Sequence, residues 1–509
     1  MLFNTYTFIF AFLPITLIGY FWLLRKRLIL GSKIWLVGAS LFFYGYWNAL
    51  YVPLLLFSIF VNFFVGSALA DVSRDDASPS FPRRRESIIS SGASRLRHNI
   101  KAKHLLIVGI LFNVILLGYF KYTDFLLENF NGIFGSNVPL PHIILPLGIS
   151  FFTFTQIAFL VDAYNGKVKE YDLLNYMLFV SYFPHLLAGP ILHHSEMMPQ
   201  FASRWNWAVR WRHIAVGLFL FSIGLFKKVL IADTFADWAN AGYDAATTLN
   251  FFEAWATSLS YTLQLYFDFS GYTDMAIGMS LMFNIRLPIN FNSPYKARDI
   301  QDFWRRWHIT LSRFLRDYIY IPLGGNRVGR WRNYLNLFAV FLIGGLWHGA
   351  SWMFVIWGAL HGAAIVIHRI WKDLGLRMWG WLGWLITFNF VNIAWVFFRA
   401  KDFEAVKKVL GGMVGMGGVV LPDKLAGKLA FLSGYGVEFG AWIQAVEPTG
   451  IKSILLMFLF ATTILALRNS QKWSKKIKPS LLYQFVTAML LAIGIVSLSK
   501  ISQFLYFQF

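Results

Sequence analysis

Long apolar runs recur along the whole chain, and polar residues gather in the short stretches between them. A helix needs about 20 mostly apolar residues to cross the hydrocarbon core of a bilayer. Several runs are shorter than this or are interrupted by Gly and Pro, so we expect partial, re-entrant or interfacial helices beside about eleven to thirteen true crossings. The runs occupy residues 6–24, 34–48, 50–69, 104–120, 143–161, 173–191, 213–232, 254–267, 271–287, 335–348, 351–370, 381–398, 452–467 and 481–499.

Composition indicates the same class of protein. Of the 509 residues, 57% are hydrophobic and 14% are charged. An ordinary soluble domain is about 45–50% apolar and about 25% charged. We therefore predict an all-α polytopic integral membrane protein, in which residues 1–509 form a single membrane domain.

The net charge of +21 follows the pattern of membrane topology. Basic residues gather in short loops, such as "RKR" at 25–27 and "SKKIK" at 474–478, and in the segment 296–332. Cytoplasmic loops carry such an excess, and anionic lipid headgroups attract it. We therefore expect membrane lipids, and no nucleic acid, to be the partners of this charge. With 25–33 in the cytoplasm, the count of crossings places both termini on the outer side.

Two segments lack the apolar pattern. Residues 71–103 are polar and rich in Ser and Arg, and we interpret them as a flexible cytoplasmic loop. Residues 411–440 are rich in Gly and are interpreted as an extramembrane loop.

The chain has no Cys, which excludes a thiol nucleophile. It also has no GxSxG, GxxxxGK[ST] or HExxH motif, which argues against a covalent serine hydrolase and a phosphate-loop ATPase.

The stretch "FWRRWHITLS" at 303–312 contains a histidine in a basic setting. Spacings of three and four place His308 on one helical face with Trp304, Leu311, Leu315 and Tyr318. The arginines lie off this face, so we predict an amphipathic helix at the cytoplasmic interface, with His308 directed into the protein. A histidine that only bonds to a neighbouring helix would give the same spacing, and this alternative stays open.

The stretch "GGLWHGASW" at 344–352 places His348 after two glycines on its own helical face. Small residues allow a second helix or a substrate to approach closely. An ionisable group within an apolar stretch is a candidate functional residue, and imidazole exchanges protons near neutral pH. A packing role remains the alternative. His361 and His368 lie on the next helix, where no acidic residue is suitably spaced, so we expect no metal site.

The stretch "YFDFSGYTDMAIGMSL" at 266–281 puts Asp268 and Asp274 in an apolar context. Such carboxylates serve ion coupling in some transporters. The alternative is a glycine-assisted helix crossing whose polar groups are satisfied by neighbouring helices. The two aspartates are six positions apart and therefore lie on different helical faces, which argues against a paired acid/base site.

Together these stretches resemble the membrane-bound O-acyltransferase (MBOAT) family, in the branch that includes AlgI, PatA and DltB. The resemblance rests on "DFSGYTDMAIGMSLMFNIRLPINFNSPYKARDIQDFWRRWHITLSRFLRDYIYIPLGGN" and on "GGLWHGASWMFVIWGALHG", and it is densest over 264–370. It implies a ring of membrane helices around a central tunnel. It also places the family's catalytic histidine on His348 and its second histidine on His308. The remaining candidates for the tunnel or the donor site are Trp304, Arg305, Arg306, Trp307, Trp347, Asp268 and Tyr272.

The resemblance further implies an O-acetyltransferase of the bacterial inner membrane. Acetyl-CoA would be the acyl donor, with no bound cofactor, and His308 would orient the thioester or stabilise its developing oxyanion. The acceptor would be an envelope polysaccharide, with peptidoglycan favoured over alginate or another exopolysaccharide. A periplasmic acetyltransferase of the PatB or AlgJ/AlgX kind would be the partner. The alternatives are D-alanyl transfer to teichoic acid and a non-catalytic acyl or lipid transporter.

Overall fold

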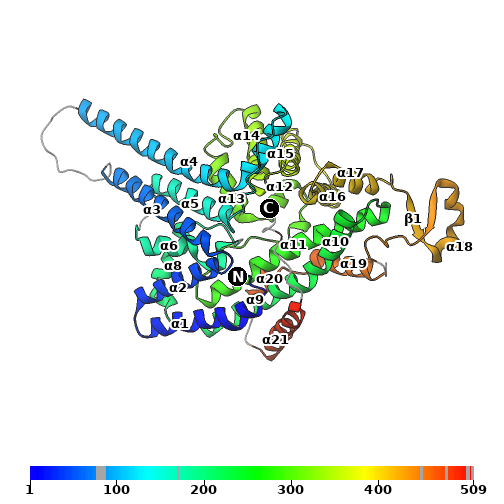
Figure 1. Cartoon of the computed structure of the whole chain (residues 1–509), viewed down its shortest axis with the longest axis horizontal. Helices are drawn as coiled ribbons and strands as arrows, with labels where there is room; N and C mark the ends of the chain where they lie inside the picture. Colours follow the sequence, from blue (N-terminus) through cyan, green and yellow to red (C-terminus); the bar gives the residue numbers. More distant parts are fainter. Residues whose placement is uncertain are drawn as a thin grey trace. The chain divides into compact units, whose positions relative to one another are not determined.

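The computed structural model describes residues 1–75, 88–168, 171–187, 189–447, 451–475, 480–499 and 505. Nearly all of the regular structure in this part of the chain is helical (Figure 1). The residues group into two compact units. Unit 1 contains Met1–Leu218 and Ala276–Pro288, and unit 2 contains Phe219–Met275 and Ile289–Phe509. The division falls inside the helices α9 (Trp211–Phe226) and α11 (Phe251–Met282).

Unit 1 is built from the N-terminal helices. Phenylalanines pack these helices together, as in the edge-to-face pair of Phe12, which directly precedes the helix Leu13–Arg25, and Phe183, which begins the helix Phe183–Leu186; the ring centroids lie 5.2 Å apart. Between Phe134 and Ile149 the chain is not helical, because three prolines there cannot extend a helix. The helices are α1 (Leu13–Arg25), α2 (Ile29–Gly45), α3 (Val52–Asp75), α4 (Ile88–Phe134), α5 (Ile149–Tyr164), α6 (Leu173–Ser181), α7 (Phe183–Leu186) and α8 (His194–Ala202).

Buried amides in unit 1 form a closed pair between α3 and α4. Asn113 Nδ2 donates to Asn62 Oδ1 over 2.6 Å and to the Gly109 carbonyl over 2.8 Å. Asn62 Nδ2 donates to Asn113 Oδ1 over 3.2 Å and to the Ser58 carbonyl over 2.9 Å. Both side chains are fully buried. Since each amide nitrogen makes two bonds, this pair stabilises a helix contact at no cost in unpaired polar groups.

Unit 2 contains the segments in which the candidate chemistry was found. Its helices are α10 (Asp233–Asn240), α12 (Ile300–Trp304), α13 (Ile309–Leu315), α14 (Arg330–His348), α15 (Trp352–Asp373), α16 (Gly380–Arg399), α17 (Phe403–Met413), α18 (Ala426–Leu429), α19 (Ile451–Ala466), α20 (Ser470–Ser474) and α21 (Leu481–Val496). The helices α14 and α15 form an antiparallel hairpin, and the turn between them follows His348 directly.

The Gly-rich segment 411–440 has more regular structure than the loop we expected. Two short strands, β1 (Val419–Pro422) and β2 (Val437–Gly440), pair in parallel, with Val419 opposite Val437. The helix α18 lies in the connection between them (Figure 1). The extramembrane position of this segment stays a prediction.

The segment 71–103, expected to be a flexible loop, is helical at both described ends. The helix α3 continues to Asp75 and α4 begins at Ile88. Residues 76–87, on which the rest of that interpretation falls, lie outside the described residues.

Membrane helices are present in both units. Six helices of the described chain are long and apolar enough to cross a bilayer, and four shorter apolar helices accompany them. The prediction of an all-α polytopic membrane protein is confirmed. The number of crossings, the ring around a tunnel and the single membrane domain stay predictions.

Candidate active site

The basic stretch around His308 is not one continuous amphipathic helix, so this expectation is wrong. The helix α12 ends at Trp304, and α13 begins at Ile309. Between them His308 adopts a left-handed backbone conformation, with φ of +41°. A left-handed backbone costs a residue with a side chain about 1–2 kcal/mol, and such a cost is often found at functional sites. The other part of the expectation holds, because His308 is fully buried.

Asn290 anchors the imidazole of His308. The Oδ1 atom of Asn290 lies 3.1 Å from His308 Nδ1 and also accepts the backbone N–H of Thr310 over 3.2 Å. A backbone N–H can only donate, so this atom is the amide oxygen, and His308 Nδ1 must carry a proton. Burial lowers the pKa of His308 to about 3, so the ring is neutral and its Nε2 is a hydrogen-bond acceptor. In this tautomer His308 cannot donate a hydrogen bond from Nε2 to an oxyanion.

His348 is the last residue of α14, and glycines explain its surroundings. A Cβ atom at Gly345 would lie 2.9 Å from the Cα of Gly358 and closer still to the Phe354 carbonyl oxygen. The close crossing of α14 and α15 therefore requires glycine, as expected for a second helix that approaches this face. The His348 side chain is 4% exposed and packs edge-on against Trp357 and Phe398.

Both predicted histidines contact the same indole. Trp347 contacts His308 with ring centroids 6.1 Å apart and contacts His348 at 4.9 Å. Residues 40 positions apart in the sequence are thereby brought into one buried cluster of imidazole and indole rings. Their catalytic roles stay predictions.

His361, considered before only as a possible metal ligand, belongs to the same cluster. It is fully buried, and Trp304 Nε1 donates to its Nδ1 over 3.2 Å. Its ring also contacts Trp357, with centroids 4.7 Å apart. The sequence signal for this role was the position of His361 one helical turn after Trp357, on the face that bears Gly358. Asn290 was missed as well, because no spacing rule connects an amide to a histidine 18 residues later.

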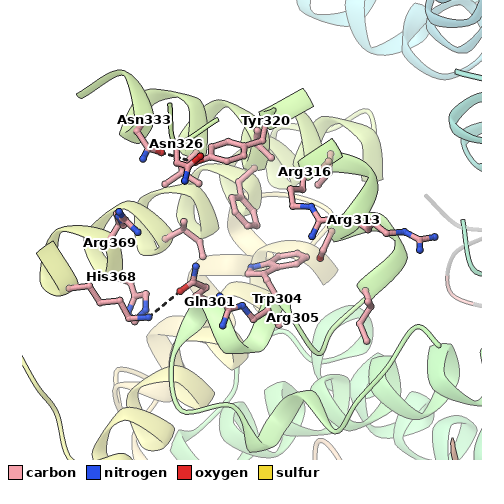
Figure 2. Close-up of a pocket in the computed structure, with 18 residues that line it drawn as sticks. Gln301, Trp304, Arg305, Arg313, Arg316, Tyr320, Asn326, Asn333, His368 and Arg369 are labelled. Carbon is pink, nitrogen blue, oxygen red and sulfur yellow. Dashed lines mark hydrogen bonds between the residues drawn. The ribbon is translucent and has the colours of Figure 1, made fainter. Parts of the chain in front are cut away.

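A basic cavity of about 490 Å³ adjoins this cluster (Figure 2). Trp304 and Arg305 line one side of it, and Tyr320, Asn326 and Asn333 line the other. Because Trp304 also bonds to His361, the cavity reaches the edge of the imidazole cluster. The cationic lining residues are Arg305, Arg313, Arg316, Arg369 and Lys372.

The other basic and aromatic candidates of this stretch have different surroundings. Arg306 does not line the cavity. Its Nε donates to Asp302 Oδ1 over 2.8 Å, and its Nη1 bonds to the Asn292 carbonyl. Trp307 is buried and packs against Phe303 and Trp395. Of the four candidate residues from 304 to 307, Trp304 and Arg305 line the cavity and the other two do not.

Asp268 is part of a structural ion pair, as the helix-crossing alternative requires. Lys228 Nζ lies 2.6 Å from Asp268 Oδ1, and both side chains are almost completely buried. Lys227 pairs in the same way with Asp274, whose carboxylate also accepts from Ser470 and Gln471. These bonds oppose the interpretation of Asp268 as a donor-binding residue.

The crossing that carries these pairs depends on two glycines. A Cβ atom at Gly224 on α9 would lie 2.5 Å from the carbonyl oxygen of Gly271 on α11. The next candidate on α11, Tyr272, is also buried in this helix. The stretch 266–281 therefore joins two helices, and the role of Tyr272 in the tunnel or the donor site stays a prediction.

Fold and site together define an all-helical, multi-pass membrane protein with a buried imidazole cluster beside a basic cavity. The sequence matches the model of the MBOAT, membrane-bound O-acyltransferase family over residues 144–403. The chain belongs to this family and is an O-acyltransferase.

Three relatives indicate its position within the family. A peptidoglycan O-acetyltransferase of Helicobacter pylori is 48% identical over 100% of this chain and 98% of its own length. A protein of Pseudomonas aeruginosa named "Probable alginate O-acetylase AlgI" is 39% identical over 82% of this chain and 75% of its own. A teichoic acid D-alanyltransferase of Bacillus subtilis is 28% identical over 52% of this chain and 73% of its own.

Proposed function

We propose that this chain moves acetyl groups from cytoplasmic acetyl-CoA across the inner membrane for O-acetylation of peptidoglycan. The observation that carries the proposal is the burial of His348 and His308 around Trp347, next to a cavity lined with cations. The full-length similarity to a peptidoglycan O-acetyltransferase supports peptidoglycan over alginate as the acceptor. A periplasmic acetyltransferase is the partner that completes delivery, and both termini lie on the periplasmic side.

Acyl transfer from a thioester to a hydroxyl requires mainly a general base and a passage that excludes water. The acceptor hydroxyl oxygen attacks the thioester carbonyl carbon, a C–O bond forms, and the C–S bond breaks. His348 takes the hydroxyl proton and returns it to the leaving thiolate. His308 holds its proton on Nδ1, which bonds to Asn290, and its Nε2 acts as the hydrogen-bond acceptor that orients a donor group of a substrate.

The basic cavity is the proposed site for the phosphates of the donor. Charge-assisted bonds from arginine to phosphate are about twice as strong as neutral ones. Along α14 the cavity lining runs from Asn333 to Phe341, which are 15 and seven residues before His348, or about 22 and 10 Å at 1.5 Å per residue. A donor with its phosphates among the arginines at the far end of the cavity is long enough to bring an acyl group toward His348 only if it is elongated, as acetyl-CoA is.

The proposal is tested by measuring base-releasable acetate on purified peptidoglycan and on exopolysaccharide. Cells carry the wild-type chain or His348→Gln, with equal membrane abundance checked by immunoblot. Glutamine keeps a polar side chain but cannot take a proton, so acetate falls by about 10²- to 10⁴-fold. His194→Gln is the matched control, because this buried histidine of unit 1 packs against Phe159 and Phe179.

The outcomes separate the alternatives. Acetate lost from peptidoglycan alone in His348→Gln supports the proposal, and loss from exopolysaccharide alone replaces the acceptor. Acetate that is unchanged in both polymers contradicts a catalytic base and favours a transporter. D-alanine released by base from the wild-type envelope, and absent in His348→Gln, would instead identify a D-alanyltransferase.

A further inference from the structure

A third imidazole lies in the cluster without a role in the mechanism described so far. His361 is fully buried on α15, and its Nδ1 accepts the indole N–H of Trp304 over 3.2 Å. In the part of the chain that the structure describes, its Nε2 has no hydrogen-bond partner. A buried polar atom left in this way costs about 1–3 kcal/mol and calls for an explanation.

The bond from Trp304 determines where the proton of His361 lies. An indole nitrogen can only donate, so Nδ1 of His361 must be the unprotonated nitrogen. The single proton of the neutral ring is therefore on Nε2. His361 thus presents a buried N–H on Nε2, whereas the proton of His308 is on Nδ1, because Asn290 accepts from it.

The His361 ring contacts one residue that lines the cavity and another that packs against His348. On one side its ring packs against Trp304, which lines the basic cavity. On the other side it packs against Trp357, whose ring centroid is 5.0 Å from that of His348. His361 thereby links the lining of the cavity to the surroundings of His348, where the acyl group of the donor has to lie. Within the described residues, the Trp357 indole N–H is also buried without a hydrogen-bond partner.

We propose that His361 is a catalytic hydrogen-bond donor, whose Nε2–H binds the carbonyl oxygen of the acyl thioester and stabilises the negative charge that develops there. The inference rests on the proposed function. While the hydroxyl oxygen bonds to the carbonyl carbon and the thiolate leaves, His348 carries the moving proton. His361 keeps its own proton throughout, so atoms and charges balance without another reactant.

The test measures acetyl transfer from radiolabelled acetyl-CoA to peptidoglycan in isolated membranes that contain the full chain, supplemented with the periplasmic fraction of the same cells, which supplies the partner. The variants are His361→Phe, which removes the donor but keeps a ring, and His361→Gln, which keeps an N–H donor. Removal of one such donor typically lowers kcat by about 10²- to 10³-fold. We expect this loss in His361→Phe, with little change in the KM for acetyl-CoA, and recovery of about tenfold or more of it in His361→Gln.

Wild-type and His348→Gln membranes make the two proposals separable. A wild-type chain without transfer, or an active His348→Gln variant, contradicts the proposed function itself. If these arms behave as expected, a His361→Phe rate within about threefold of wild type overturns the inference, since a lost oxyanion donor costs far more. Equal losses in His361→Phe and His361→Gln also overturn it, because they indicate packing alone.

Protein abundance and the thermal denaturation midpoint are measured for every variant. If His361→Phe does not accumulate, Trp304→Phe takes its place. This variant removes the bond that fixes the proton on Nε2, and we expect kcat to fall by about tenfold, as for other groups that orient a catalytic imidazole. An unchanged kcat in Trp304→Phe overturns the inference.

Discussion

Buried polar groups have opposite arrangements in the two units. Between α3 and α4, the four amide hydrogens of Asn62 and Asn113 all have acceptors. In the cluster around α14 and α15, His361 keeps a buried N–H with no hydrogen-bond partner in the described chain. A closed pair stabilises the fold and has no N–H left to donate to a substrate. An open group, a buried N–H without a partner, lowers stability but can donate a hydrogen bond to a substrate, which is the arrangement that catalysis requires.

The ion pairs on α11 show that charge and burial alone do not mark a catalytic group. Asp268 is as buried as His308, and it lies next in sequence to Phe269, which packs against that histidine. Its carboxylate is nevertheless neutralised by Lys228. Polar groups of the closed kind are therefore expected to change stability when altered, and those of the open kind to change the rate of transfer.

The largest expected effect is on stability, in Lys228→Met. Loss of the ammonium leaves Asp268 as an unpaired buried carboxylate, which typically costs about 3–5 kcal/mol. We expect a strong fall in the thermal denaturation midpoint of the purified protein. The double variant Lys228→Met with Asp268→Leu should recover much of it. A Lys228→Met variant that stays stable but loses acetyl-transfer activity would show that Asp268 takes part in the reaction and not only in stability.

A smaller loss of stability is expected in Asn62→Leu. The Asn113 side chain then lacks its partner, and an unsatisfied buried amide costs about 1–3 kcal/mol. The double variant with Asn113→Leu removes both amides and should return close to the wild-type midpoint. The rate of acetyl transfer per folded molecule is expected to stay unchanged in both variants. A reduced rate in the stable double variant would contradict a purely structural role.

Asn290→Ala tests the hydrogen bond that determines the tautomer of His308, in the cluster around α14 and α15. Without the amide oxygen, His308 loses the bond that fixes its proton on Nδ1. We expect kcat to fall by about tenfold to hundredfold, as when other orienting groups are removed. Thr310→Val is the matched control, since it removes only the hydroxyl that bonds to the same oxygen. Equal losses of kcat in the two variants would show that the local backbone, and not the tautomer of His308, limits the rate.

The fold class was predictable because apolar runs are a one-dimensional signal. The runs at 335–348 and 351–370 became α14 and α15 with boundaries shifted by a few residues. The break between α12 and α13 was not predictable in the same way. It depends on Ile309 and Thr310 bonding to Asn290, which a helical wheel does not contain.

The site was predictable in its residue types and not in its hydrogen bonds. His308 and His348 were found from their motifs, and the structure brings them to the same indole. Which nitrogen of each ring carries a proton depends on partners such as Asn290 and Trp304. These partners are far away in sequence, so the difference between an acceptor and a donor imidazole appears only in three dimensions.

The smallest expected effect separates two adjacent arginines. Arg305 lines the basic cavity, whereas Arg306 pairs with Asp302 outside it. An exposed charge contributes up to about 1 kcal/mol, so Arg305→Gln should raise the KM for acetyl-CoA by about threefold to fivefold and leave kcat unchanged. The increase should shrink at high salt, which already screens the phosphates. Arg306→Gln should leave this KM unchanged, and an equal rise in both variants would show that general surface charge, not the cavity, attracts the donor.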